Sequence, residues 1–174
     1  RRAKFLLLDL RSGRTLLVHL GMSGNLLFRP RGEKHDHLAF AFDDGSTLVY
    51  NDPRRFGLLL VLDKGEENTC RYLQKLGPEP LSSAFNTRYL TDLCQRRRNP
   101  IKILIMDNCA VVGVGNIYAS EALFRARIHP ATPATAIDPT DLANLVKEIK
   151  RVLRAAIRKG GTTISDYRGS GEGG

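Results

Sequence analysis

The chain has 174 residues, of which 27 are Lys or Arg and 18 are Asp or Glu, so its formal net charge at pH 7 is +9. Hydrophobic residues make up 42% of the sequence, which is enough for a packed core and excludes an intrinsically disordered chain. This length suits one large domain or two small ones. A domain this basic usually binds a polyanion, most often nucleic acid.

The sequence argues against membrane and metal sites. No apolar run approaches the roughly 20 residues of a membrane-spanning helix, and no signal-peptide pattern is present, so we expect no membrane contact. Cys70, Cys94 and Cys109 lack the spacing of metal ligands, which predicts reduced thiols in a cytoplasmic protein. No third ligand accompanies His35 and His37, so we predict no metal site in this chain.

The first half of the chain has the pattern of β-strands. Apolar, β-prone segments cover residues 4–10, 14–20, 38–42, 46–50 and 57–62. Turn residues join the first two segments at 11–13, and Asp43-Asp44-Gly45 joins the next two as a strong hairpin signal. We expect six short strands in this half, of which these five segments have clear bounds, and their close spacing predicts an antiparallel β-sandwich or barrel.

The second half has the pattern of helices. We expect four of them: one capped by Ser82 or Ser83, one beginning at Pro100, one over 117–126, and a long one capped by Asp138. The predicted division is a β-domain at 1–75, a linker at 76–81, a helical domain at 82–168 and a flexible glycine-rich segment at 169–174.

A glycine turn between two of the helices is the first candidate site. Gly113 and Gly115 precede Asn116, which is expected to cap the following helix. Free amides at a helix N-terminus attract phosphate. A turn that only packs one helix on another fits the spacing equally well.

Three further clusters carry cations or exposed apolar side chains. Lys4 follows two arginines, Met22 lies between two glycines, and Arg54 and Arg55 precede Phe56. Arginine planes and aromatic rings suit stacking on bases, and an exposed Met can act as an apolar wedge. The alternatives are solvated cations, a Met that fills the core, and a buried Phe.

The long last helix has a basic side. Off its apolar stripe lie Lys147, Lys150, Arg151, Arg154 and Arg158. A solvated surface is a more frequent explanation for such a face than a DNA contact.

Six motifs in order carry a resemblance to a known family. They are RRAK at 1–4, HLGMSG at 19–24, EKHDH at 33–37, DPRRFG at 52–57, LGPEPL at 76–81 and VGVGNIYASE at 112–121. The chain resembles bacterial formamidopyrimidine-DNA glycosylase, the 8-oxoguanine glycosylase/AP lyase, over nearly all its length. The resemblance implies an α+β protein, in which an antiparallel β-sandwich is followed by a helix–two-turn–helix domain. The implied partner is double-stranded damaged DNA, bound by a monomer.

The resemblance also implies a role for each site residue. Met22, Arg54 and Phe56 correspond to side chains that fill the gap left by a flipped nucleotide, with Arg54 on the orphaned cytosine. Lys4, His19 and Asn116 correspond to residues that bind backbone phosphates. Residues Gly160, Gly161, Thr162 and Thr163 correspond to the start of a loop that covers the everted base.

The sequence departs from the family at both ends. It begins without Met inside a strand pattern and ends in a glycine-rich segment, so we expect a fragment of a longer protein. The family's N-terminal proline nucleophile, its neighbouring glutamate and its C-terminal zinc finger with one zinc ion have no counterpart here. We therefore expect the fragment alone to be inactive, with Lys4 as an auxiliary catalytic residue.

Two other interpretations stay open. An endonuclease VIII-type glycosylase has the same architecture but removes oxidised pyrimidines. A non-catalytic nucleic-acid-binding module is the alternative from a different class. The motifs around Met22, Arg54 and Phe56 favour the purine-specific enzyme.

Overall fold

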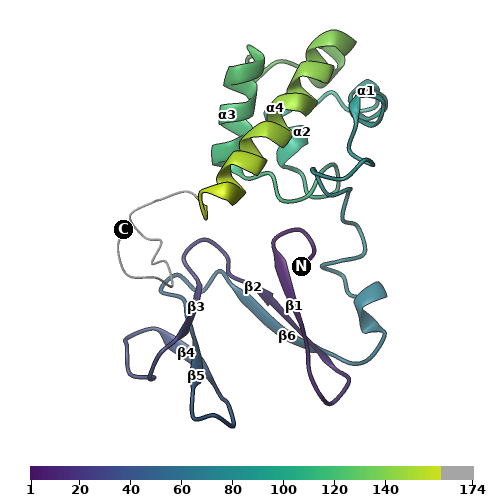
Figure 1. Cartoon of the computed structure of the whole chain (residues 1–174). Coiled ribbons are helices and arrows are strands. Elements are labelled where there is room, and N and C mark those ends of the chain that lie inside the picture. Colours follow the sequence, from purple (N-terminus) through teal and green to yellow (C-terminus); the bar gives the residue numbers. More distant parts are fainter. Residues whose placement is uncertain (162–174) are drawn as a thin grey trace. The chain divides into compact units, whose positions relative to one another are not determined.

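The computed structural model describes residues 1–161. Contacts between residues divide this part into two compact units, one over Arg1–Glu67 and one from Asn68 onward. We call them the β unit and the helical unit (Figure 1).

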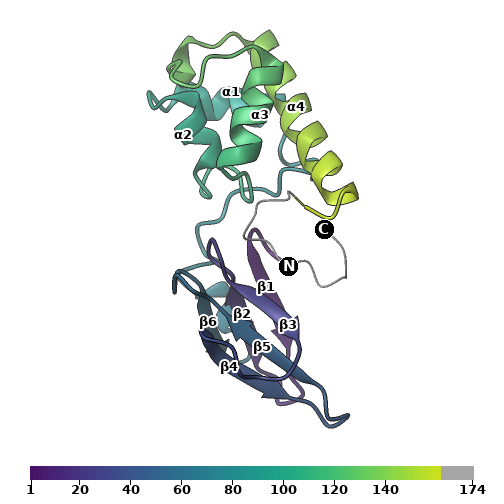
Figure 2. The same ribbon diagram turned by 90° about the vertical axis from the view of Figure 1, so that its left-hand side faces the viewer.

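The β unit consists of two three-stranded antiparallel sheets (Figure 2). One has the order β1 (Phe5–Asp9), β2 (Thr15–His19), β6 (Leu58–Leu62), and the other β3 (Asn25–Phe28), β5 (Thr47–Asn51), β4 (Asp36–Ala41). The central strands carry the best buried side chains, with Leu17 and Val18 on β2 and Val49 on β5 fully buried. The predicted sandwich is confirmed, and β3 is the sixth strand, for which the sequence pattern gave no range.

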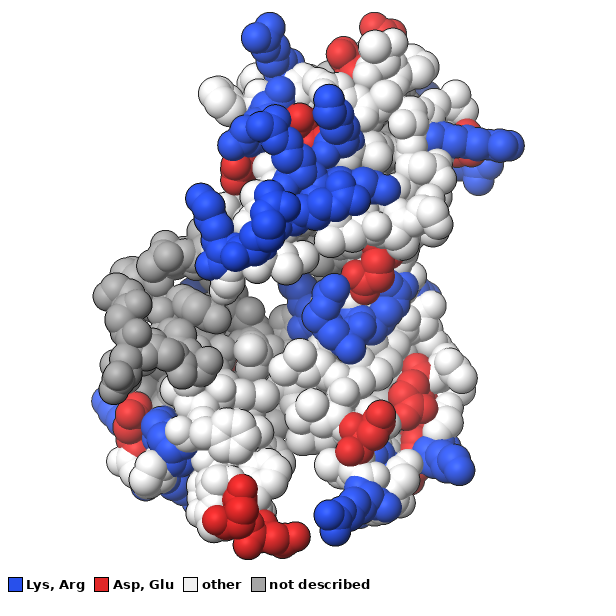
Figure 3. Space-filling model, viewed as in Figure 1, with Lys and Arg blue, Asp and Glu red and all other residues white. Residues whose placement is uncertain are grey.

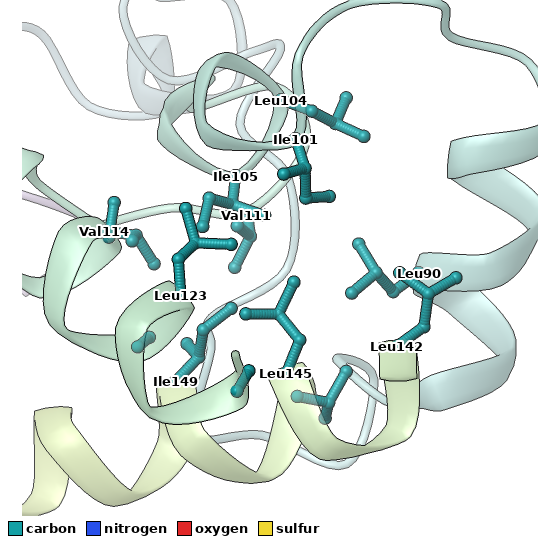
Figure 4. Packing of buried hydrophobic residues seen from close by; sticks show 14 of the residues in the cluster. Leu90, Ile101, Leu104, Ile105, Val111, Val114, Leu123, Leu142, Leu145 and Ile149 are labelled. Carbon is teal, nitrogen blue, oxygen red and sulfur yellow. The ribbon is translucent and has the colours of Figure 1, made fainter. Parts of the chain in front are cut away.

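The helical unit contains four α-helices and short 3₁₀ segments. Their bounds are η1 (Glu66–Asn68, at the junction of the units), α1 (Thr87–Gln95), α2 (Ile101–Met106), α3 (Asn116–Ala126), η2 (Ala134–Ala136) and α4 (Pro139–Arg158). A single apolar cluster joins them, with Ile105 of α2, Leu123 of α3 and Leu145 of α4 at its centre (Figure 4). The predicted all-helical second half is confirmed.

Three of the helix starts differ from the sequence prediction. Pro100, predicted as the first residue of its helix, is the cap of α2, which begins at Ile101. Asn86 caps α1 by accepting the Tyr89 N–H at 2.9 Å, whereas Ser82 donates its hydroxyl to the Glu79 carbonyl. The cap of α3 is Gly115, and Asn116 is the first helical residue, so the prediction that Asn116 caps this helix is wrong. In all three cases the observed start lies one to four residues from the predicted one. Asp138 does precede Pro139 at the start of α4, but its side chain makes no capping hydrogen bond.

Candidate nucleic-acid interface

A buried carboxylate organises one end of the β unit. Asp52 is 0% exposed and accepts hydrogen bonds from Ser23 Oγ at 2.8 Å, Tyr50 Oη at 3.0 Å and the Gly57 N–H at 2.8 Å. The Arg54 N–H adds a weaker bond at 3.3 Å. These bonds join the loop at 20–24, which holds Ser23, to the loop at 52–57.

The charge of Asp52 is stabilised by dipoles rather than by a cation. Burial alone would raise the pKa of this carboxyl, but the hydrogen bonds from Gly57, Ser23 and Tyr50 hold the pKa below its ordinary value. Burial and the bond to Asp52 raise the pKa of Tyr50 to about 12, so the phenol keeps its proton and remains a donor. The hydrogen bonds that join the two loops are therefore strongest while Asp52 is ionised.

The same loops approach each other closely at a glycine. Gly21 has a φ of +67°, and a Cβ built there would lie 2.7 Å from the carbonyl carbon of Phe56 and 2.8 Å from the amide nitrogen of Gly57. No larger residue fits this approach. The loop that carries Met22 thus lies directly on the backbone of the loop that carries Phe56.

The predicted wedge side chains point into solvent. Met22 is 73% exposed and Phe56 is 58% exposed. The Arg54 guanidinium lies over the Phe56 ring, 4.9 Å from its centroid. Arg55, next to them, has a φ of +57°, a left-handed conformation that is rare for a residue other than glycine and often found at functional sites. Exposed apolar side chains on two fixed loops are available to a partner rather than used in the core.

Lys4 and His19 form a second group on the β unit. Arg2 and Phe5 exchange two backbone hydrogen bonds, which places Lys4 exposed at the tip of a tight turn. Phe5 pairs with His19 across the sheet, and their rings lie 4.9 Å apart. Lys4 therefore directly precedes the strand residue that pairs with His19.

Their ionisation suits an anion. Partial desolvation lowers the pKa of both groups, and the Lys4 charge lowers that of His19 further. The imidazole is then mostly neutral at pH 7. Its Nδ1 accepts the Gly21 N–H at 3.1 Å, so in the neutral ring the proton lies on Nε2. An ammonium and a ring N–H are both groups that donate to phosphate oxygens.

In the helical unit, the turn between α2 and α3 presents a helix N-terminus. Val112 and Val114 are buried, and the Val112 N–H donates to the Pro78 carbonyl at 3.1 Å. The first intrahelical bond of α3 is from Ala119 to Gly115. Within the described residues, the amides of Asn116 and Ile117 have no partner, and both residues are exposed. The capping role predicted for Asn116 is wrong, but the free amides on which the predicted anion site depends are present, and the site itself stays a prediction.

The end of α4 holds the first part of the predicted lesion loop. Gly161 donates to the Ala156 carbonyl and Gly160 to that of Ile157, and both glycines have positive φ, which is a common way to end a helix. With Tyr118 they help to line a cavity of 370 Å³. Thr162 and Thr163 lie outside the described residues.

A metal site and a membrane-spanning helix are both absent from the described residues. Within residues 1–161 no group of three His, Cys, Asp or Glu residues could hold a metal ion. Of the same residues, no helix combines the length and the apolar character needed to cross a membrane.

Sequence reasoning missed the importance of Asp52, Ser23 and Tyr50. Asp52 was visible only as the start of a motif, and its partner Ser23 lies 29 residues away in the chain. The usable signal was an aspartate directly after a strand and before proline, a position where a solvated turn is also common.

The structure defines a class of protein, with a β-sandwich that has cationic and apolar loops followed by a helical unit with a free helix N-terminus. Residues 1–59 match the family described as formamidopyrimidine-DNA glycosylase N-terminal domain. Residues 76–168 match the family described as formamidopyrimidine-DNA glycosylase H2TH domain. The chain therefore belongs to the formamidopyrimidine-DNA glycosylase family.

Curated relatives and solved structures agree with this assignment. The chain is 51% identical over 170 residues to the formamidopyrimidine-DNA glycosylase of Shewanella loihica, covering 96% of this chain and 62% of that protein. The protein of the same name from Acinetobacter baylyi is 48% identical, with 96% and 61% covered. The chain thus spans about three-fifths of the length of these relatives.

Two solved structures are similar in sequence and in fold. The MutM (Fpg) protein of Thermus thermophilus has a TM-score of 0.87 at 40% identity, covering 95% of this chain and 61% of that one. The Lactococcus lactis glycosylase, solved non-covalently bound to DNA that contains an AP site, has a TM-score of 0.89 at 30% identity, with 95% and 63% covered.

Proposed function

We propose that this chain is the duplex-binding part of a base-excision repair enzyme that removes oxidised purines and then cleaves the strand at the abasic site. Family membership supports the glycosylase over a non-catalytic binding module. The observation that carries the proposal is the exposure of Met22 and Phe56 on two loops fixed by Asp52, with Arg54 beside them. Side chains of this kind can enter a base stack when a nucleotide leaves it.

Arg54 is proposed to satisfy the base that remains. Cytosine offers two adjacent acceptors, O2 and N3, to the paired donors of a guanidinium, whereas adenine offers N1 beside an amino donor that opposes an N–H. Arg54 therefore favours a lesion or abasic site opposite cytosine. A good bidentate base contact discriminates by about 1–3 kcal/mol.

Three residues are proposed to bind backbone phosphates. Lys4 and His19 supply an ammonium and an Nε2 donor from adjacent positions, and Asn116 supplies an amide at the N-terminus of α3. These contacts carry no sequence information, because phosphates are the same at every base pair. Removing Lys4 flattens the salt dependence of binding by about one unit of slope.

The test is duplex binding by the chain with an abasic site placed opposite C or opposite A. We expect tighter binding opposite C. Arg54→Ala should reduce this preference, measured as the dissociation constant opposite A divided by that opposite C, by about 5- to 150-fold. Arg55→Ala removes an equal charge from the neighbouring residue and is the matched control. Phe56→Ala is expected to weaken binding opposite both bases alike.

If Arg54→Ala leaves the preference for C over A unchanged, Arg54 does not contact the unpaired base. If Arg55→Ala then loses the preference, that contact belongs to Arg55. Equal affinity of the unmodified chain for abasic and undamaged duplex would contradict the proposed function as a whole.

Lys4 is also proposed as an auxiliary catalytic residue, because a lysine of lowered pKa forms an amine nucleophile more readily. Borohydride trapping on abasic DNA compares the chain with Lys4→Arg, which keeps the charge but forms no imine. A trapped adduct that is lost in Lys4→Arg would assign the chemistry to Lys4. If the nucleophile is a residue that this chain does not contain, neither the unmodified chain nor Lys4→Arg should give a trapped adduct.

For the whole protein we propose what the family resemblance implies. These features are an N-terminal proline nucleophile, one zinc ion in a finger outside this chain, a monomer and a cytoplasmic location. The loop from Gly160 to Thr163 is proposed to cover the everted base. The domain boundaries at 1–75, 76–81 and 82–168 are proposed for the same reason.

A further inference from the structure

The basic residues of α4 fall into two groups. Lys150 is used internally, since its Nζ donates to the Ser82 carbonyl at 2.9 Å and lies 6.0 Å from the centroid of the Phe85 ring. The other group is exposed and consists of Lys147, Arg151, Arg154 and Arg158, which we call the α4 stripe.

The α4 stripe lies along one side of the helix. Its members are spaced by four, three and four residues, which keeps them on one face of a helix with 3.6 residues per turn. From Lys147 to Arg158 the stripe extends about 16 Å. The opposite face carries Leu145, Ile149 and Val152 into the core.

The charges of the α4 stripe are almost uncompensated. Across residues 1–161, Lys147, Arg154 and Arg158 have no hydrogen-bond or ion-pair partner, and Arg151 reaches Glu148 Oε1 only at 3.5 Å. Arg125 on α3, by contrast, pairs with Glu121 at 2.9 Å. Figure 3 shows Lys and Arg side chains gathered over the front of the helical unit, where Figure 1 draws α4.

Helix stability does not explain this arrangement. Like charges three or four residues apart destabilise a helix, and the helix dipole favours only the cation in the last turn, Arg158. Lys147, Arg151 and Arg154 thus repel one another in the free protein. A polyanion along the stripe would relieve that repulsion.

We propose that the α4 stripe binds the phosphate backbone of duplex DNA. Its length equals roughly five base-pair steps of about 3.4 Å, so its cations can lie along one side of a duplex and contact several backbone phosphates. The choice of duplex DNA rests on the proposed function. The stripe adds affinity that is independent of sequence and of damage, since it meets only phosphates.

The stripe extends the phosphate site at Asn116 along the helical unit. α3 packs on α4, and Tyr118, two residues after Asn116, lines one cavity with Leu153 and Ile157 of α4. The C-terminal end of the stripe therefore lies near the N-terminus of α3. A duplex held at Asn116 has further cations available along α4.

The test compares two triple variants of the whole chain on undamaged duplex DNA. K147Q/R151Q/R154Q removes three cations of the stripe and keeps good helix formers. R11Q/R14Q/K64Q removes the same residue types from exposed positions. By the register of β1, β2 and β6, these control positions follow or precede the strand ends near Thr15, at the far end of the sheet from His19. Binding is measured by fluorescence anisotropy from about 50 to about 200 mM salt.

We expect K147Q/R151Q/R154Q to reduce the salt slope by about 2.7 units, so that its loss of affinity over this salt range is about 40-fold smaller than that of the unmodified chain. R11Q/R14Q/K64Q should change the slope by less than half as much. K147R/R151K/R154K keeps the charges and should keep the slope.

Equal slopes for the two Gln triples, or no measurable duplex binding by the unmodified chain, would overturn the proposal. Because the DNA is undamaged, the result is separate from the C-to-A test of Arg54. A stripe effect with no preference for abasic DNA would support the stripe while contradicting the proposed glycosylase function.

Discussion

The two units fix their candidate DNA contacts by different physical means. In the β unit, the loops with Met22 and Phe56 are joined through hydrogen bonds to one buried charge, Asp52. In the helical unit, the turn before Asn116 is anchored by buried Val112 and Val114. The first arrangement depends on protonation and on donor geometry, whereas the second depends on close packing. The two sites should therefore fail under different perturbations.

The largest effect is expected from a cavity in the helical unit. Ile105→Ala removes a fully buried side chain from α2 and should destabilise the protein by about 2–5 kcal/mol. Ile103→Ala, at a 57% exposed position on the same helix, is the matched control and should cost less than about 0.5 kcal/mol. Hydrogen exchange measured by mass spectrometry should show lost protection in the helical unit only. Equal loss in the β unit would mean that the units do not fail separately.

A methyl group at the contact between the β-unit loops should have the next largest effect. Gly21→Ala combines a positive φ with contacts under 3 Å to backbone atoms, and we expect a loss of about 2–4 kcal/mol. Gly13→Ala has a similar φ of +80° but open space around its Cβ, so it isolates the backbone term of about 1–2 kcal/mol. Urea unfolding gives both values. If the two variants were equally destabilised, the close approach of the loops would be disproved.

Acid should affect the β-unit loops through Asp52. Because its folded pKa is below the ordinary value of 3.8, the stabilisation it provides is complete above that value and is lost as the pH falls through the folded pKa. Asp52→Asn should cost about 1–3 kcal/mol near pH 7 and progressively less as acid protonates the wild-type carboxyl. Urea midpoints measured from neutral pH down to strongly acidic pH test this, with exposed Asp43→Asn as control. Parallel curves for Asp52→Asn and wild type would contradict it.

The smallest effect is a titration shift at His19. Lys4 lowers the pKa of the imidazole, so Lys4→Gln should raise that pKa, while Arg1→Gln should change it less. Nitrogen-15 NMR should also find the neutral ring protonated at Nε2, as the bond from Gly21 to Nδ1 requires. A proton on Nδ1 at neutral pH would be inconsistent with that bond.

The sequence predicted those features that depend on local patterns. Apolar, β-prone segments bounded by turn residues located five strands, and the 3-4 spacing from Leu142 to Ile157 located α4. The four-residue strand β3 was too short to stand out after the Gly24 turn. The cap of α3 was misassigned because Asn is the better cap by preference, while the observed dihedrals place Gly115 there.

The features that escaped prediction depend on contacts between distant residues. Nothing near Asp52 in the chain indicates that Ser23 donates to it, or that Gly21 lies on the Phe56 backbone. The spacing of the α4 stripe could be read from the sequence, but the lack of partners for its cations could not. The sequence alone places Lys150 with these cations, whereas in the structure it donates to the Ser82 carbonyl and is not part of the α4 stripe.

The contact between Pro78 and Val112 has a practical consequence for dissecting the protein. The Gly77 N–H donates to the Asn108 carbonyl at 2.8 Å, and a Cβ at Gly77 would lie 2.7 Å from the Ala110 oxygen. The Leu76–Pro80 segment therefore packs against the α2–α3 turn and stabilises it. A truncated protein for isolated study of the helical unit must start before Gly77, because a start at Ser82 would leave the Val112 amide without its acceptor.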